Sequence, residues 1–188
     1  MASHKFFNLK TTKIRDLKIA VRNPIFDQRG YFERLFCINE LNDLVADRNI
    51  LQINRSFTEI MGTVRGLHYQ IPPKSEMKLV SCIKGEIFDV SVDLRKNSRT
   101  FLNWHGEKLS ESNNKTILIP EGFAHGFQTL SDNVELIYFH TALYDPNSER
   151  GINPVDSALA IDWPLEISQI SNRDKKHPFI DNKFSGIQ

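Results

Sequence analysis

Residues 77–94 read MKLVSCIKGEIFDVSVDL, two runs rich in valine, isoleucine and other strand-forming residues on either side of Lys84-Gly85. Each run is long enough for one strand, and the glycine between them can adopt the backbone angles of a tight turn. Two strand-like runs joined in this way predict a β-hairpin. This stretch is the first indication that the protein is built from β-strands.

Short strand-like segments recur along the rest of the chain, separated by clusters of Gly, Pro, Asn and Asp. Only one segment has clear helical spacing, a helix from about Glu40 to Ala46 that Asn39 can cap. A short helical turn is expected near Pro154–Leu159, and residues 181–188 are expected to form a loose tail. Many short strands without alternating helices predict an all-β antiparallel sandwich or jelly roll. Among the expected strands are residues 11–21, 31–36, 50–58, 116–119 and 134–144.

The length and charge of the chain limit its architecture and its partners. A chain of 188 residues suits one domain, spanning residues 1–188, with a core that needs no disulfides. The net charge of +1 gives no reason to expect binding to nucleic acid or to an anionic membrane. Cys37 and Cys82 are far apart and lie among apolar residues, which favours reduced thiols. Because the N-terminus also lacks the apolar core of a signal peptide, we expect a cytoplasmic protein.

The segment Val64-Arg65-Gly66-Leu67-His68-Tyr69-Gln70 contains two side chains suited to a binding site. Arg65 offers a permanently charged, forked donor, and His68 offers a base that works near neutral pH. On a regular strand, residues three apart point to opposite faces. Gly66 must therefore bend the strand if both side chains serve one site. Without that bend, the segment is an ordinary strand end with a surface arginine and a buried histidine.

Gln52, Asn54 and Ser56 share one face of the strand expected over residues 50–58. On a surface strand this polar row has no particular meaning. Inside a barrel it is a row of hydrogen-bonding groups directed at a ligand. The spacing alone does not choose between the two.

The segment Pro120-Glu121-Gly122-Phe123-Ala124-His125 has the Pro-x-Gly-x-x-His form of the second cupin motif. The first cupin motif normally adds a His-x-His pair and a glutamate, whereas here only His68 is present. Two histidines fall short of the three protein ligands that a catalytic transition metal needs. We therefore expect no metal, and a metal-dependent cupin oxygenase is kept as an alternative.

A further set of segments matches one known family, from about Asp16 to Pro178: Arg29-Gly30 and residues 65–70, 78–80, 85–95 and 119–127. Together these segments resemble the dTDP-4-dehydrorhamnose 3,5-epimerase family. The resemblance implies a cupin-type double-stranded β-helix, or jelly roll, with a few short helices. It also implies a homodimeric enzyme without metal or cofactor, in which an N-terminal strand often crosses to the partner. The implied reaction inverts C3 and C5 of dTDP-4-keto-6-deoxy-D-glucose to give dTDP-4-keto-L-rhamnose.

The hydrogens at C3 and C5 are acidic because both carbons lie next to the C4 carbonyl. Inversion needs a base on one face of the sugar, an acid on the other, and a donor to the enolate oxygen. The resemblance gives these roles to His68 as base, Tyr138 as acid and Lys78 at the enolate oxygen. It also gives Asp174 the role of orienting His68, since a base histidine needs a partner on its other nitrogen.

The resemblance further assigns residues that bind the substrate. Arginine forks suit phosphate oxygens, and an aromatic ring suits stacking on thymine. The implied contacts are Arg29 and Arg65 to the diphosphate or sugar, Gln52 and Asn54 to the nucleotide, His125 to the sugar, Tyr144 to the thymine, and Glu149 and Arg173 to other parts of the ligand.

Two departures from the family pattern keep other functions open. Arg34 stands where the family often has a glutamate, with Glu33 one residue early, and Phe139-His140 replaces a common lysine and its neighbour. His140 shares a strand face with Tyr138, so it either tunes that acid or fills space. An epimerase acting at C3 or C5 only, or on another nucleotide, is therefore an alternative. A sugar-nucleotide-binding module without turnover is a further alternative.

Overall fold

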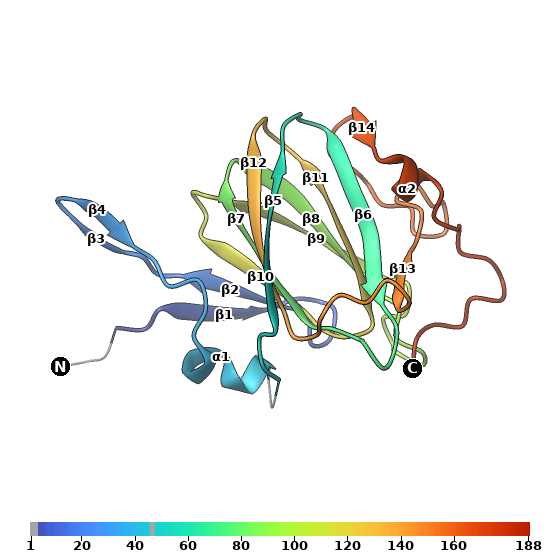
Figure 1. Ribbon diagram of the computed structural model, residues 1–188, viewed down its shortest axis with the longest axis horizontal. Helices are drawn as coiled ribbons and strands as arrows, with labels where there is room; N and C mark the ends of the chain where they lie inside the picture. The colour runs from blue at the N-terminus through green and yellow to red at the C-terminus, as the bar shows by residue number, and fades with distance from the viewer. Residues whose placement is uncertain (1–3, 46–47) are drawn as a thin grey trace.

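The computed structural model describes residues 4–45 and 48–188 and has the cupin-type jelly roll that the sequence predicts, with two antiparallel sheets face to face (Figure 1). The first sheet has the order β1 (Phe7–Thr11), β2 (Lys18–Arg22), β10 (Lys115–Ile119), β7 (Lys78–Lys84), β12 (Val134–His140), β5 (Gln52–Thr58). The second has the order β13 (Glu149–Gly151), β6 (Thr63–Gln70), β11 (Phe123–Thr129), β8 (Glu86–Asp93), β9 (Trp104–Ser110), and β14 (Gln169–Ile170) also pairs with β6.

The prediction of a hairpin around Lys84-Gly85 is wrong. β7 pairs with β10 and β12 in the first sheet, whereas β8 pairs with β11 and β9 in the second. Gly85, with φ of 76°, turns the chain from one sheet to the other. Both runs are strands, as expected, but a local pattern does not show which strand a segment pairs with.

The apolar side chains of both sheets meet in a core between them. Val80 of β7 and Ile87 of β8 lie in this core with Leu109, Ile117 and Leu136, and all five are completely buried. Burying one such side chain contributes about 1.5–3 kcal/mol. Tyr138 packs against the edge of this cluster, so the core also supports a residue of the expected site.

Two N-terminal boundaries differ from the prediction. The strand expected over residues 11–21 is interrupted between β1 and β2, where Thr12 Oγ1 donates to the carbonyl oxygens of Ile14 and Leu17. The Thr12 side chain satisfies backbone carbonyl groups of a local turn, which the spacing of the apolar residues does not indicate. The strand expected to reach Phe36 ends at Phe32. The helix α1 (Ile38–Val45) begins before Asn39, and its expected last residue, Ala46, lies outside the described residues.

The C-terminal region is better ordered than predicted. The helical turn expected near Pro154–Leu159 is a series of turns, and the second helix is α2 (Asn172–Lys175), capped by Ser171. The prediction of a loose tail over residues 181–188 is wrong for Ile187. This residue is only 9% exposed, and its N–H donates to Leu94 O at 2.7 Å. One apolar side chain and its backbone bonds therefore anchor the end of the chain to the barrel.

A separate hairpin of β3 (Ile25–Asp27) and β4 (Gly30–Phe32) projects away from the barrel (Figure 1). Its tip is the turn that the sequence predicts at Asp27–Gly30. Phe26, Tyr31 and Phe32 are all exposed on it. None of the described helices is long and apolar enough to cross a membrane.

Candidate active site

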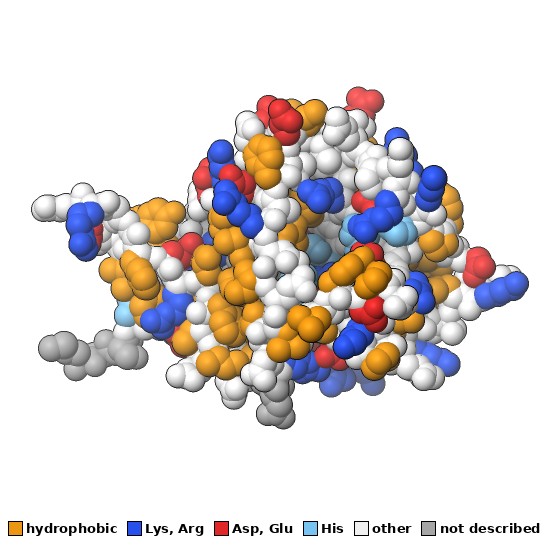
Figure 2. All heavy atoms as spheres, in the orientation of Figure 1, with side chains coloured by type: hydrophobic (Ala, Val, Ile, Leu, Met, Phe, Trp, Pro, Cys, Tyr) orange, Lys and Arg blue, Asp and Glu red, His pale blue; other side chains and the backbone are white. Residues whose placement is uncertain are grey.

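A cavity of about 390 Å³ opens between the two sheets, a size in the range of small-molecule sites. β5, β7 and β12 of the first sheet form one wall, and β6 and β11 of the second form the other. Figure 2 shows histidine side chains inside a hollow at the centre of this face, with lysine or arginine side chains beside them. The polar row Gln52, Asn54 and Ser56 lines the cavity, which decides the question that the sequence left open.

A bulge in β6 directs Arg65 and His68 into the same cavity. His68 pairs with His125 of β11 and Arg65 pairs with Phe127, so Gly66 and Leu67 together stand opposite Gly126. This extra residue brings side chains three apart onto one face. Gly66 has a φ of 128°, and a Cβ there would lie 2.5 Å from Gly126 Cα. The predicted departure from regular strand geometry at Gly66 is confirmed.

Asp174 of helix α2 holds the His68 side chain. His68 Nε2 lies 2.8 Å from Asp174 Oδ1, and the Gly66 N–H donates to Asp174 Oδ2 at 3.1 Å. Burial opposes the charged form of Asp174, but the His68 and Gly66 hydrogen bonds and the Arg173 charge outweigh it and lower the pKa of Asp174. An ionised carboxylate only accepts, so Nε2 carries the proton and Nδ1 is the basic nitrogen.

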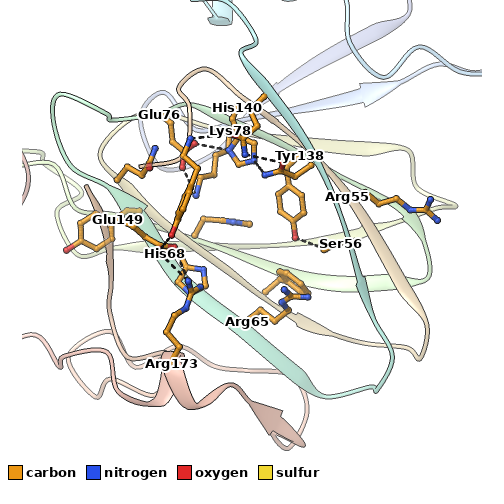
Figure 3. Close-up of a pocket in the computed structure, with 17 residues that line it drawn as sticks. Arg55, Ser56, Arg65, His68, Glu76, Lys78, Tyr138, His140, Glu149 and Arg173 are labelled. Atoms are coloured by element: carbon orange, nitrogen blue, oxygen red, sulfur yellow. Dashed lines mark hydrogen bonds and ion pairs between the residues drawn. The ribbon is translucent and has the colours of Figure 1, made fainter. Parts of the chain in front are cut away.

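Tyr138 projects into the cavity from the wall opposite His68 (Figure 3). Its hydroxyl lies 3.1 Å from Ser56 Oγ on the neighbouring strand β5. Burial, only partly offset by this hydrogen bond, raises the pKa of Tyr138 to about 12. The phenol therefore keeps its proton at neutral pH and can act as an acid.

Lys78 lies at the cavity wall in contact with Glu76, a residue that the sequence analysis did not identify. Lys78 Nζ is 3.0 Å from Glu76 Oε1, and His140 Nδ1 is 2.8 Å from Glu76 Oε2. Burial raises the pKa of Glu76, but the contacts with His140 and Lys78 more than offset this and lower it. A signal for Glu76 existed, because a residue two positions before Lys78 can share its face.

His125 also has a carboxylate partner that the sequence analysis missed. His125 Nε2 is 2.7 Å from Asp89 Oδ2, and Asp89 is completely buried. The two side chains meet diagonally across β8 and β11, where Asp89 is opposite Phe127 and His125 is opposite Ser91. An aspartate at a buried strand position is the signal that could have indicated it, since a buried charge requires a partner.

The remaining expected residues form the rim of the cavity. Tyr144 Oη donates to Glu149 Oε2 at 2.9 Å, and Arg173 Nη1 lies 3.3 Å from both Glu149 oxygens. Arg173 Nη2 also approaches His68 Nε2 to 3.0 Å, but with the Nε2 proton directed at Asp174 both nitrogens are donors, so no hydrogen bond joins them. Gln52, Asn54, Arg65 and His125 line the same cavity, so the structure brings together all the expected residues except Arg29.

Arg29 does not reach this cavity within its own chain. It lies at the tip of the β3–β4 hairpin, where its side chain is 90% exposed and pairs with Asp27 at 2.6 Å. Because the hairpin extends away from the barrel, Arg29 lies far from the other expected site residues of the same chain (Figure 1).

Among the described residues, ligand atoms of His68, Asp174 and His177 lie within 4.8 Å of one another, an arrangement that could hold a metal. The Arg173 guanidinium beside His68 Nε2 adds a positive charge that disfavours a cation there. Metal-independent activity stays a prediction, tested by metal analysis of active protein.

Comparison with known proteins decides the family. Residues 11–182 match the family model described as dTDP-4-dehydrorhamnose 3,5-epimerase. A curated enzyme of that name from Shigella flexneri is 40% identical over 168 residues, covering 89% of this chain and 92% of the relative. The chain belongs to the dTDP-4-dehydrorhamnose 3,5-epimerase family. It is therefore an isomerase of the epimerase type.

Solved structures and further relatives agree with this family. The dTDP-6-deoxy-D-glucose-3,5-epimerase of Legionella pneumophila, solved with dTDP-4-keto-L-rhamnose, superposes with a TM-score of 0.89 and 38% identity. The match covers 97% of this chain and 98% of that chain. A dTDP-4-dehydrorhamnose 3-epimerase from Streptomyces niveus is 36% identical over 150 residues, covering 79% of this chain and 72% of the relative. Proteins similar to this chain thus carry both double-epimerase and single-epimerase names.

Proposed function

We propose that the protein inverts C3 and C5 of dTDP-4-keto-6-deoxy-D-glucose, giving dTDP-4-keto-L-rhamnose in deoxysugar nucleotide synthesis. The observation that carries this proposal is the placement of His68 and Tyr138 on opposite walls of one cavity. Inversion of a carbon next to a ketone needs a base and an acid on opposite faces of the same carbon. The two sheets of the jelly roll supply one each.

In the proposed mechanism, His68 Nδ1 removes the proton from C3 or C5, and the electron pair of the C–H bond moves into an enolate with its charge on the C4 oxygen. Asp174 stabilises the imidazolium that forms and holds its orientation. The Lys78 ammonium stabilises the enolate oxygen. Tyr138 then returns a proton to the opposite face of the carbon. A positioned acid or base of this kind contributes about 10²–10⁴-fold in rate.

The rim residues suit the nucleotide part of the substrate. Arg65 and Arg173 supply guanidinium groups for the diphosphate, and the amides of Gln52 and Asn54 supply donors and acceptors for the nucleoside. Tyr144 is 54% exposed at the rim, which leaves its ring available for stacking on thymine. These contacts hold the sugar between His68 and Tyr138.

The proposal takes the active form to be a cytoplasmic homodimer. The exposed β3–β4 hairpin carries three aromatic side chains that a partner subunit would cover. In such a dimer, Arg29 at its tip would reach the partner's cavity rather than its own, which accounts for its place outside the site. Both cysteines are free thiols, in keeping with a reducing compartment.

The second candidate is inversion at one carbon only. The single-epimerase name of the Streptomyces niveus relative keeps it open. Both reactions use the same base, acid and enolate stabiliser, so they differ in how the sugar can turn within the cavity.

Incubation with dTDP-4-keto-6-deoxy-D-glucose in deuterated water separates these functions. We expect deuterium at both C3 and C5 of the product, together with inverted configuration at both carbons by NMR. Deuterium at one carbon would establish the single-position reaction. Deuterium at neither carbon would contradict the proposed function.

A further inference from the structure

Glu76 is a buried carboxylate that binds two bases of the cavity wall at once. Its side chain is 8% exposed, and each of its oxygens contacts a different base, Lys78 Nζ at Oε1 and His140 Nδ1 at Oε2. A buried charge with both oxygens occupied has little freedom to move. Glu76 therefore fixes the position of Lys78 relative to His140 (Figure 3).

The hydrogen bonds beyond His140 assign its tautomer. The ionised Glu76 carboxylate only accepts, so the contact assigns the His140 tautomer with the proton on Nδ1 and with Nε2 as the acceptor. Asn54 Nδ2 lies 3.3 Å from this Nε2 and can donate to it. The side-chain amide of Asn54 is thereby oriented by a histidine on the neighbouring strand.

The hydrogen bonds keep the same donor-to-acceptor order from Asn54 to the rim of the cavity. Gln52 Nε2 donates to Asn54 Oδ1 at 3.1 Å, and Gln52 Oε1 accepts from the Tyr144 N–H at 3.1 Å. Every donor in this row faces an acceptor, from the Tyr144 backbone to Glu76. The opposite tautomer of His140 would place two donors against each other at Asn54.

His140 also contacts the proposed acid. Its ring stacks on Tyr138 with centroids 6.0 Å apart and an interplanar angle of 21°. Tyr138 is two residues before His140 on β12, so both side chains lie on the same face of the strand. The register also places His140 opposite Gln52 of β5 and Lys78 of β7. His140 thus contacts the proposed acid, the carboxylate that binds Lys78, and the side-chain amide of Asn54.

We propose that Glu76 and His140 form a positioning pair, which aligns Lys78 and Tyr138 for proton transfer and sets the donor–acceptor direction of Gln52 and Asn54 for the nucleotide. This inference rests on the proposed function for the roles of Lys78 and Tyr138. It also gives a physical role to His140, where the sequence departs from the family pattern. Neither residue touches the reacting carbons, so both act through their neighbours.

The chain contains a matched control for this pair. On β9 and β10, Glu107 contacts His105 Nε2 at 3.2 Å and Lys115 Nζ at 2.5 Å, the same three residue types. Contacts with His105 and Lys115 lower the pKa of Glu107, as the corresponding contacts do for Glu76. None of these three residues lines the cavity.

The kinetic test compares Glu76→Gln with Glu107→Gln in the full-length protein. Glutamine keeps the volume of Glu76 but has one acceptor oxygen, so it cannot satisfy Lys78 and His140 together. We expect kcat to fall roughly 10- to 100-fold in Glu76→Gln, the scale of a misplaced catalytic group, with a higher KM from the loosened amides. Glu107→Gln should keep both constants within about twofold of wild type, because its pair lies outside the cavity. Wild-type kcat and KM in a folded Glu76→Gln variant would overturn the proposal.

The structural test is the ¹⁵N NMR spectrum of the His140 ring in the free protein. We expect protonated Nδ1 and unprotonated Nε2 in wild type, and a mixture of tautomers in Glu76→Gln. A proton on Nε2 of wild-type His140 would overturn the proposed direction of the row. This measurement needs no substrate, so its result is independent of the proposed reaction. The NMR spectrum can contradict the positioning pair while deuterium incorporation by wild type supports the reaction, and the reaction can likewise be contradicted while the NMR spectrum supports the pair.

Discussion

At the scale of single residues, Asp174 joins helix α2 to strand β6. Its two oxygens accept from His68 and from the backbone of Gly66, both on β6. One carboxylate thus holds His68, the proposed base, and the bulge that directs His68 into the cavity. The resemblance in sequence pointed to Asp174, but the Gly66 contact is visible only in the structure.

Replacing Asp174 should separate catalysis from stability. Asp174→Asn removes the charge that favours the His68 imidazolium, so we expect kcat to fall about 10²–10⁴-fold. Asp156 is an equally buried aspartate (3% exposed, as is Asp174) that accepts from the Ala158 and Ile180 N–H groups away from the cavity. Asp156→Asn should lower the unfolding temperature while folded protein stays active. Equal loss of kcat in the two variants would reject the role of Asp174.

The acid dependence of stability follows from the lowered pKa of Asp174. A carboxylate with a depressed pKa in the folded state adds stability above its unfolded value, near 3.8, and this stability is lost as the pH falls below that value. Wild type should therefore lose more free energy of unfolding than Asp174→Asn between about pH 5 and about pH 2. Denaturant unfolding at a series of pH values measures this, and identical acid profiles would contradict it.

Several expected site residues, and Asp174 as the partner of His68, could be identified from the sequence, whereas Glu76 and Asp89 could not. His68, Tyr138 and Lys78 lie in recognisable segments, and the structure places all three around one cavity. Asp89 contacts His125, 36 residues away, and Glu76 contacts His140, 64 residues away, although its other partner, Lys78, is only two residues away. Pairings of this kind depend on strand register, which local patterns do not specify.

At the scale of elements, the bulge in β6 decides whether the site exists. Two residues of β6 stand opposite one of β11, and only this offset brings Arg65 and His68 to one face. The need for a bend at Gly66 followed from the spacing of the two side chains. The hairpin at Lys84-Gly85 shows the opposite case, where a correct strand prediction led to a wrong pairing.

Alanine at Gly66 should destabilise the protein more than alanine at Gly30. Both glycines have φ near 130°, 128° and 132°, so both variants carry a backbone cost of about 1–3 kcal/mol. Only the Gly66 Cβ would overlap backbone, at 2.5 Å from Gly126 Cα, whereas a Cβ on Gly30 has nothing within 4 Å. The overlap adds roughly 1–3 kcal/mol. Equal free energies of unfolding for the two variants would show that the close approach of β6 and β11 is not constrained.

At the scale of the whole molecule, the jelly roll places the proposed acid and the proposed base on different sheets. β12 carries Tyr138 and β6 carries His68, and no short segment of sequence contains both. The sequence indicated the all-β class because its strands are short and its turns are clear. The resemblance in sequence assigned Arg29 to the site, whereas in the structure of one chain this residue lies on a projecting hairpin.

Mixing two inactive variants tests whether Arg29 acts across a dimer. In a mixed dimer of Arg29→Ala and His68→Asn, one cavity has an intact His68 together with Arg29 from its partner. Random exchange of subunits should therefore restore about a quarter of the wild-type sites. Refolding the two variants together and measuring epimerase activity gives the result, with each variant refolded alone as the control. No recovery in mixtures that contain dimers would reject action in the partner's cavity.

Product and deuterium analysis of Tyr138→Phe beside His68→Asn, in deuterated water, is the most direct test of base and acid on opposite walls. We predict that Tyr138→Phe still exchanges the substrate hydrogen, because His68 remains, but returns deuterium mainly to the original face, so exchange exceeds inversion. His68→Asn should show neither exchange nor inversion. Full inversion by Tyr138→Phe, or exchange at the wild-type rate by His68→Asn, would contradict the account.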